Sequence, residues 1–176
     1  MLIIYCWLLD ESWRTIATTS GGKWRINLVS LVLVSHSKAL ADGLRDMVVQ
    51  VAGESVRVAA AGGTADGRLG TNADAVLNAI RASLADDDDG VLVLLDLGSA
   101  WLSVEMAIEE LSDSERARVR VSEAPLVEGA VLAAVQASVG APLAEVAAAA
   151  AGAASMSKAP GGMLRYTHRR FAGASS

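Results

Sequence analysis

The central part of the chain alternates between short, nearly continuous apolar runs and longer segments in which apolar residues recur every three or four positions. The apolar runs are residues 28–35 (LVSLVLVS), 55–63 (SVRVAAAGG), 90–100 (GVLVLLDLGSA) and 117–124 (ARVRVSEA). Continuous apolar runs are typical of strands buried on both faces, and their alternation with helical spacing is typical of βαβ units. The pattern predicts a single three-layer α/β domain, with a central, mainly parallel four-stranded sheet flanked by helices.

The segments between these runs carry helical spacing and helix start signals. Ser37 is a natural N-cap for the first helix, and Gly53 ends it because glycine is favoured just past a helix C-terminus. Pro125 and Pro142 start the last two helices, since proline is favoured in a first turn. The expected helices cover residues 38–52, 71–85, 101–111, 125–140 and 141–154.

The two ends of the chain lack this pattern. Residues 1–27 are expected to be an N-terminal extension outside the domain, which spans residues 28–155. Residues 156–176 lose all periodicity and are expected to be a flexible basic tail, in which His168 is given no role. No apolar run reaches the roughly 18 residues that a membrane span needs, and the first residues lack the basic start of a signal peptide. We therefore expect no membrane association.

Composition and charge narrow the function classes. About half of the 176 residues are apolar (52%) and a fifth are charged (20%), which suits one folded domain. The net charge of -5 and the absence of a basic face in the central region argue against a nucleic-acid partner. The single cysteine, Cys6, excludes an internal disulfide framework and fits a reducing cytoplasm.

Polar residues with candidate chemistry follow the first three expected strands. In parallel sheets, ligands gather beyond the carboxyl ends of the strands, which here carry SHS, GRLGT and DLGSA. His36 has two interpretations, a partly buried histidine bonded to backbone or a nucleophile whose ring a carboxylate orients. Asp96, at the matching end of another strand, could supply that carboxylate.

Two expected helix starts could bind an anion. Gly98 would let an anion approach the backbone and Ser99 could add a hydroxyl, although Ser99 could equally be an ordinary helix cap. Gly70 and Thr71 repeat this arrangement after the second strand, with the same two interpretations open. One histidine and one carboxylate are too few for a metal site, and no G-x-S-x-G elbow suggests a hydrolase. Together these residues describe a site for a phosphate on an imidazole nitrogen.

The motifs LVLVSHS (31–37), GRLGT (67–71), VLVLLDLGSA (91–100) and EAPLVEGA (123–130) also carry a resemblance. In this order and spacing they resemble the phosphotransfer subunits, DhaM, of the phosphoenolpyruvate-dependent dihydroxyacetone kinases. The domain of those subunits belongs with the mannose-type EIIA domains of the bacterial phosphotransferase system. The resemblance covers about residues 29–153 and implies a sheet order of 2-1-3-4.

The resemblance implies a cytoplasmic, homodimeric phosphocarrier that binds no permanent cofactor and carries a phosphoryl group on His36. By similarity, His36 would accept that group on Nε2 from the phosphohistidine of the carrier protein HPr, while Asp96 bonds the other ring nitrogen. It would pass the group to ADP on the DhaL subunit, which phosphorylates dihydroxyacetone bound to DhaK. Some relatives append HPr-like and enzyme I-like domains, for which this chain is too short, so separate proteins are expected to supply the phosphate.

Two other functions stay open at this point. An EIIA component of a mannose-type sugar transporter or regulatory system would share the histidine and dock on different partners. DLGSA and APLVEG favour the kinase subunit over that function. The third interpretation is a non-catalytic α/β interaction module in which His36 is structural.

Overall fold

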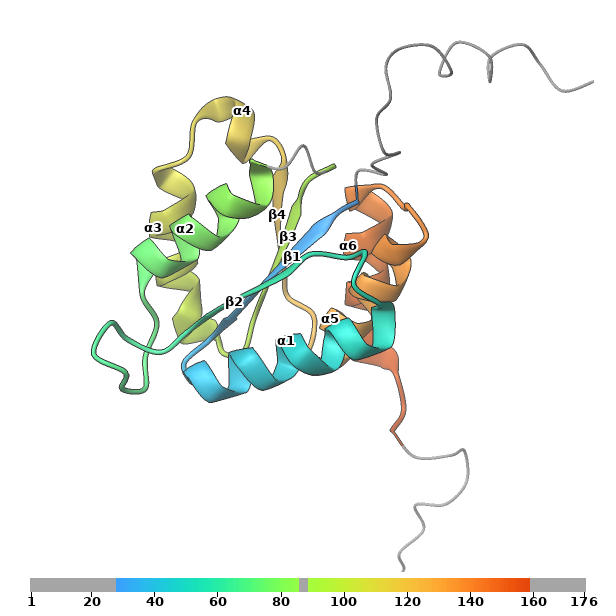
Figure 1. Ribbon diagram of the computed structural model, residues 1–176, viewed down its shortest axis with the longest axis horizontal. Coiled ribbons are helices and arrows are strands. Elements are labelled where there is room, and N and C mark those ends of the chain that lie inside the picture. The colour runs from blue at the N-terminus through green and yellow to red at the C-terminus, as the bar shows by residue number, and fades with distance from the viewer. Residues whose placement is uncertain (1–27, 86–88, 159–176) are drawn as a thin grey trace, which may run out of the picture.

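A computed structural model of the protein describes residues 28–85 and 89–158. Its four strands are β1 (Ser30–Ser35), β2 (Val58–Gly62), β3 (Val91–Leu95) and β4 (Val119–Ser122). They form one sheet in the order β2-β1-β3-β4, and every neighbouring pair is parallel (Figure 1). The predicted fold class and strand order are confirmed. The expected extension and residues 159–176 of the expected tail lie outside the described residues, so those boundaries stay predictions.

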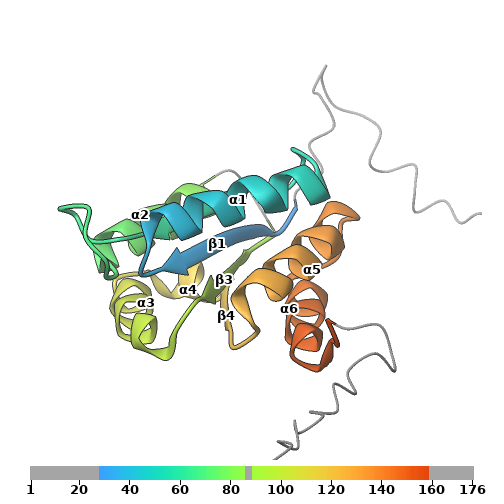
Figure 2. The same ribbon diagram turned by 90° about the horizontal axis from the view of Figure 1, so that it is seen from below.

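Helices cover both faces of the sheet (Figures 1 and 2). They are α1 (Lys38–Ala52), α2 (Ala73–Leu84), α3 (Trp101–Glu109), α4 (Asp113–Arg116), α5 (Leu126–Ser138) and α6 (Leu143–Gly152). Two 3-10 turns, η2 (Gly98–Ala100) and η3 (Ala153–Ser155), precede α3 and follow α6. The short helix α4 was not expected, because four residues are too few to show apolar periodicity, although Ser112 and Glu115 form a capping box at its start.

The two faces of the central strands carry different side chains. Four leucines of β1 and β3 face α1, α5 and α6, whereas four valines of the same strands, together with Leu95, face α2 and α3. Such alternation follows from the two-residue period of a strand. Because both sets of side chains are apolar and buried, both faces of the central strands belong to the core. The leucines are Leu31, Leu33, Leu92 and Leu94, and the valines are Val32, Val34, Val91 and Val93.

The first helix is seated directly on the end of strand β2. Ser37 caps α1, as predicted, by accepting a hydrogen bond from the Leu40 N–H at 3.3 Å. A Cβ added to Gly62 in β2 would lie 2.8 Å from the Ser37 carbonyl oxygen and 2.9 Å from the Lys38 Cα. Both atoms belong to the backbone that follows His36, so the packing of β2 against α1 fixes where His36 leaves the sheet.

We expect Gly62→Ala to lower the free energy of unfolding by about 1–3 kcal/mol, the usual cost of overpacking a dense interior. The added methyl group meets backbone atoms, which cannot rotate away. Gly43→Ala in α1 is the matched control, because a Cβ there meets nothing within 4 Å. It should raise stability by about 0.5–1 kcal/mol through helix propensity. Denaturant titration measures both, and an unchanged midpoint for Gly62→Ala would contradict this packing.

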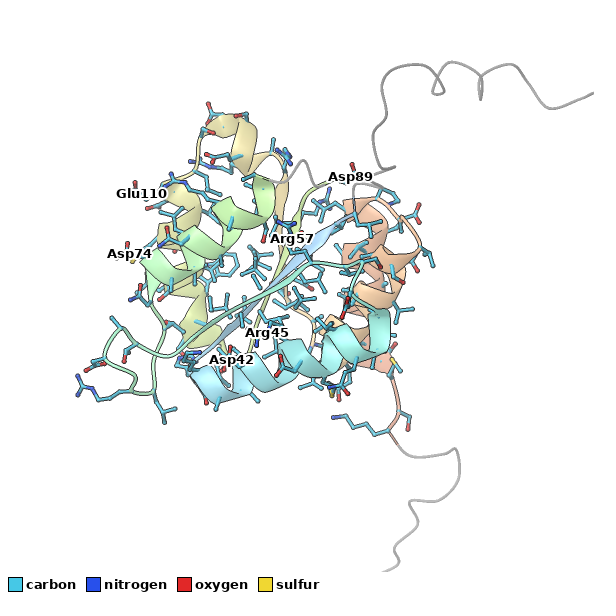
Figure 3. The ribbon with its side chains drawn as sticks, viewed as in Figure 1. Asp42, Arg45, Arg57, Asp74, Asp89 and Glu110 are labelled. Carbon is cyan, nitrogen blue, oxygen red and sulfur yellow. The ribbon has the colours of Figure 1, made fainter. Side chains whose placement is uncertain are left out.

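Charged side chains lie on the outside of the domain and at both ends of the sheet (Figure 3). Asp42 and Arg45 pair on α1 at 3.4 Å, close to the carboxyl ends of the strands. Asp89 precedes β3 and lies at the opposite end of the domain. Within residues 28–85 and 89–158, no helix is long and apolar enough to cross a membrane.

Candidate functional site

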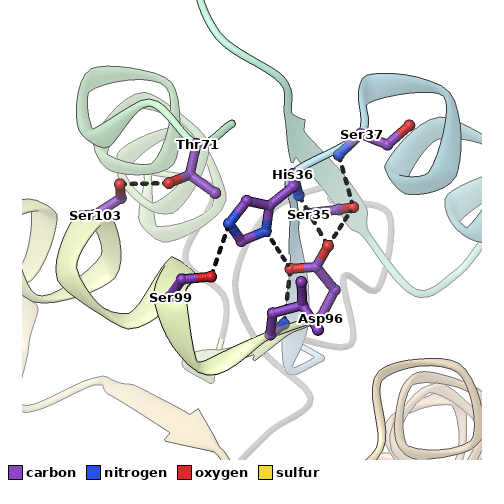
Figure 4. A network of polar contacts seen from close by, with 8 residues as sticks. Ser35, His36, Ser37, Thr71, Asp96, Ser99 and Ser103 are labelled. Atoms are coloured by element: carbon purple, nitrogen blue, oxygen red, sulfur yellow. Dashed lines mark hydrogen bonds and ion pairs between the residues drawn. The ribbon is translucent and has the colours of Figure 1, made fainter. Parts of the chain in front are cut away.

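The carboxyl ends of β1 and β3 bring His36 and Asp96 together (Figure 4). The two strands are neighbours, and their pairing extends one residue beyond β3 because the Asp96 N–H donates to the Val34 carbonyl at 3.1 Å. Asp96 therefore lies opposite Ser35 and His36. The Nδ1 atom of His36 lies 2.9 Å from Oδ1 of Asp96, with 25% and 12% of the two side chains exposed.

Asp96 accepts four hydrogen bonds, two on each carboxylate oxygen. Oδ2 accepts from the Ser35 hydroxyl and from the His36 N–H, both at 2.9 Å. Oδ1 accepts from the Leu97 N–H at 2.8 Å and faces His36 Nδ1. An ionised carboxylate has about four lone-pair sites, so this one is fully used.

These contacts keep Asp96 ionised. Partial burial works to raise the pKa of Asp96, but hydrogen bonds from the His36 N–H, the His36 ring and the Ser35 hydroxyl outweigh it. The result is a pKa below the ordinary aspartate value. A carboxylate that stays ionised can only accept hydrogen bonds, so the hydrogen between it and the imidazole belongs to Nδ1.

This arrangement selects one tautomer of His36. With its hydrogen on Nδ1, a neutral imidazole presents an unprotonated Nε2 that can accept a hydrogen bond or act as a nucleophile. Nε2 lies on the outer side of the ring, 3.0 Å from the Ser99 hydroxyl. His36 thus has a fixed orientation and a nucleophilic nitrogen on the exposed rim of the sheet.

Ser99 contacts His36 and caps no helix. It lies inside the turn η2, whose start at Leu97 has no side-chain cap, and α3 begins without one as well. The interpretation of Ser99 as a helix cap was therefore wrong. Gly98 is exposed in the same turn, and a Cβ there would meet nothing within 4 Å, so the backbone at Gly98 is open to an approaching group. That these two residues bind phosphate stays a prediction.

The loop after β2 holds the backbone of His36. The Gly70 N–H donates to the His36 carbonyl at 2.9 Å, so this donor is already engaged. Thr71 precedes the cap of α2, which is Asn72, and its hydroxyl lies 2.6 Å from that of Ser103. The expected start of a helix near Thr71 was thus two residues too early, and a cap at Thr71 was wrong. Phosphate contacts from Gly70 and Thr71 stay predictions, and the contacts observed here are structural.

The site holds one histidine and one carboxylate in contact. Among the described residues, no three His, Cys, Asp or Glu side chains are grouped closely enough to hold a metal ion. The Ser99 hydroxyl, which lies in the exposed turn η2, contacts Nε2. A neutral donor of this kind suits an anion that is bound and then released.

Comparison with known proteins places the fold and the site in a family. The family model of the mannose-type EIIA domains, described as the PTS system fructose IIA component, matches residues 30–147. The chain belongs to this family. The match includes β1, β3 and the loops that carry His36 and Asp96 of this mannose-type EIIA domain.

Curated relatives of this mannose-type EIIA domain are DhaM proteins. The phosphoryl donor subunit DhaM of PEP-dependent dihydroxyacetone kinase 2 from Listeria innocua is 42% identical over 109 residues, which are 62% of this chain and 86% of the relative. The Escherichia coli DhaM subunit is 43% identical over 122 residues, which are 68% of this chain and 25% of that longer protein. The resemblance to DhaM is confirmed.

A solved structure with the same fold is the crystal structure of the unknown function protein EF1359. It is 34% identical to this chain, covers 70% of it and 93% of its own length, and superposes with a TM-score of 0.61. The similarity supports the four-stranded α/β architecture described above.

Two residues of this EIIA domain were missed by sequence reasoning. Ser35 is fully buried at the end of β1, where it bonds Asp96, and Ser103 of α3 bonds Thr71. A serine that ends an apolar strand and precedes a candidate nucleophile was a usable signal, because a buried hydroxyl requires a partner. Ser103 gave no such signal, since serine is common on the exposed faces of helices.

Proposed function

We propose that this chain is a phosphohistidine carrier that serves a phosphoenolpyruvate-dependent dihydroxyacetone kinase. His36 accepts a phosphoryl group from phospho-HPr and passes it to ADP on a DhaL subunit, which phosphorylates dihydroxyacetone on DhaK. One observation carries the proposal: Asp96 holds Nδ1 of His36 at 2.9 Å, so that in the neutral ring Nε2, on the exposed rim, is the nitrogen without a hydrogen. The DhaM names of the relatives supply the substrate class.

The transfer is an exchange of phosphorus–nitrogen bonds. The lone pair on Nε2 attacks phosphorus, the bond to the donor imidazole breaks, and its electron pair returns to that ring. Phosphoryl transfer has a loose transition state, so positioning and charge stabilisation supply most of the catalysis. Asp96 stabilises the positive charge that develops on the His36 ring as the new bond forms, and the ring hydrogen stays on Nδ1.

The same site serves donor and acceptor in turn. Nε2 lies at the surface, and the groups nearest to it come from η2. A partner that brings a phosphohistidine and a partner that brings ADP must therefore approach the same rim at different times. We extend the proposal to a homodimer in the cytoplasm, by similarity to DhaM subunits.

A second candidate function is an EIIA component of a sugar transporter or regulatory system. The description of the matching family, a fructose IIA component, favours it because such a domain would carry the same phosphohistidine. The two functions differ in the acceptor alone.

The acceptor is identified by a transfer experiment. The full chain is phosphorylated with phosphoenolpyruvate, enzyme I and HPr, then mixed with ADP-loaded DhaL or with the EIIB domain of a mannose-type transporter. We expect the phosphoryl group to appear as ATP on DhaL and to stay on the chain in the presence of the EIIB domain. Transfer to the EIIB domain alone would favour the transporter function. DhaL that carries no ADP is the control.

We expect Ser99→Ala to slow phosphorylation of His36 about tenfold, the rate equivalent of one hydrogen bond to a charged group. In the resting site the Ser99 hydroxyl lies 3.0 Å from Nε2, so it is placed to donate to the incoming phosphoryl oxygens. Ser138→Ala is the control, because its hydroxyl bonds the Val135 carbonyl near the C-terminus of α5. Equal rates for both variants in a rapid-quench labelling assay would remove Ser99 from the mechanism.

A further inference from the structure

Ser35 is a buried polar residue that bonds Asp96. The proposed function gives it no role. Ser35 ends β1 with 0% of its surface exposed, directly after four leucine and valine residues. Its hydroxyl lies 2.9 Å from Oδ2 of Asp96 and 3.1 Å from the Ser37 N–H. Burying a hydroxyl costs free energy unless its hydrogen bonds are made, and both are made here.

The direction of these two hydrogen bonds follows from the donors. The Ser37 N–H can only donate, so the Ser35 oxygen accepts that bond. The single hydrogen of the hydroxyl then points to Asp96, which is ionised and can only accept. A directed chain therefore runs from the Ser37 N–H through the Ser35 hydroxyl to Oδ2 of Asp96.

This series of hydrogen bonds determines which oxygen of Asp96 contacts the imidazole. Oδ2 is occupied by the Ser35 hydroxyl and the His36 N–H, whose positions are fixed by strand β1. The carboxylate can then satisfy His36 Nδ1 only through Oδ1. With the Ser35 donor lost, one lone pair on Oδ2 would have no partner and the carboxylate could rotate toward other donors.

We propose that Ser35 is a positioning residue for phosphoryl transfer, which acts through Asp96 to fix the orientation and tautomer of His36. The proposal rests on the proposed function, because it assigns Ser35 a part in the same reaction. Ser35 contacts no reacting atom. It holds the carboxylate plane in place and favours the ionised form, so that the hydrogen stays on Nδ1 and Nε2 stays unprotonated.

The test compares Ser35→Ala with a matched loss of a buried hydroxyl. Ser83→Ala in α2 is the control, because Ser83 is 1% exposed and its hydroxyl bonds the Ala79 carbonyl, within the same helix. We expect Ser35→Ala to be phosphorylated about fivefold more slowly, the rate equivalent of one ordinary hydrogen bond, and Ser83→Ala at the wild-type rate. Ser35→Thr, which retains a hydroxyl, should recover most of the rate.

Two spectroscopic measurements separate positioning from a loss of stability. In Ser35→Ala, a carbon-13 titration of the Asp96 carboxyl should move to higher pH, because one donor to the carboxylate is gone. His36 is the titratable side chain that contacts Asp96, and the remaining contacts come from the N–H groups of His36 and Leu97. Nitrogen-15 spectra should show His36 as a mixture of tautomers in Ser35→Ala and as the Nδ1–H form in the wild type and in Ser83→Ala.

The outcomes distinguish this inference from the proposed function. Uptake of label by His36→Ala at the wild-type level would overturn the proposed function. Labelling of His36 in the wild type, with Ser35→Ala equal to it in rate and in the Asp96 titration, would overturn the role of Ser35 alone. If Ser35→Ala is too unstable to purify, Ser35→Cys keeps the shape with a weaker donor and should change both quantities in the same direction.

Discussion

The His36→Ala variant is expected to take up no phosphoryl group from phosphoenolpyruvate, enzyme I and HPr, under conditions that label the wild type fully. His36 supplies the nitrogen on which the group is carried, so its loss removes the intermediate and does not merely slow its formation. The label on the wild type should be lost in acid and retained in alkali, as expected for a phosphorus–nitrogen bond. The measurement is labelled protein on a gel after quenching.

His36→Asn is the matched control for this experiment. Its side-chain amide can still donate a hydrogen bond to Oδ1 of Asp96, where Nδ1 donates in the wild type, but it has no nucleophilic nitrogen. We expect it to be unlabelled and to unfold closer to the wild type than His36→Ala does. The alanine variant leaves Asp96 with one donor fewer, a cost of about 1 kcal/mol. Equal labelling of all three proteins would overturn the carrier assignment.

The sequence pattern was sufficient to predict the buried strands and to place His36 and Asp96 at the same edge of the sheet. Continuous apolar runs show which strands are buried, and parallel neighbours place their carboxyl ends along one edge. His36 directly follows β1 and Asp96 directly follows β3, so these two facts place both residues at that edge, and they meet because β1 and β3 are neighbours. The strand order itself came from the resemblance to a family, since apolar periodicity does not determine which strands are neighbours.

The hydrogen bonds around the pair could not be predicted in the same way. Local signals gave Ser99 and Thr71 as possible caps, but tertiary contacts with His36 and Ser103 use their hydroxyls instead. The residue that caps α2 is Asn72, one residue after Thr71. Apolar periodicity cannot distinguish these two positions, because helix boundaries are uncertain by a residue or two. Which hydroxyl caps a helix and which enters the site depends on backbone positions that only the folded chain fixes.

The contacts of Gly70 were likewise not predictable from the local sequence. Its sequence context, a glycine before a helix, is shared with anion-binding loops. In the folded chain its N–H is directed inward to the His36 carbonyl, and a Cβ there would lie 2.6 Å from Thr64 Cγ2. The glycine is required because the loop must pass close to Thr64 with a φ of 147°, and its effect on the site is to hold the backbone of His36.

Asp96→Asn should slow phosphorylation of His36 about a hundredfold or more, the order found when a base loses the carboxylate that fixes its tautomer. The four donors around Asp96 explain the size of the effect. An amide offers one oxygen and one NH2 group, so two of those donors must face another donor. If the NH2 group faces Nδ1, the hydrogen of His36 moves to Nε2 and blocks the nucleophile. If the NH2 group faces the backbone N–H of His36, two hydrogen-bond donors point at each other and repel.

The same variant tests the pKa of Asp96 through stability. Because that pKa is below the ordinary aspartate value of 3.8, the ionised carboxylate stabilises the fold above this pH and the contribution is lost as pH falls through the lowered pKa. We expect the free energy of unfolding of the wild type to exceed that of Asp96→Asn by about 2 kcal/mol near neutral pH. This difference should shrink below about pH 4. Asp89→Asn, exposed at the opposite end of the domain, should show neither effect. A difference between wild type and Asp96→Asn that stays constant as the pH falls would mean that the charge on Asp96 does not support the fold, and unchanged labelling would remove Asp96 from the mechanism.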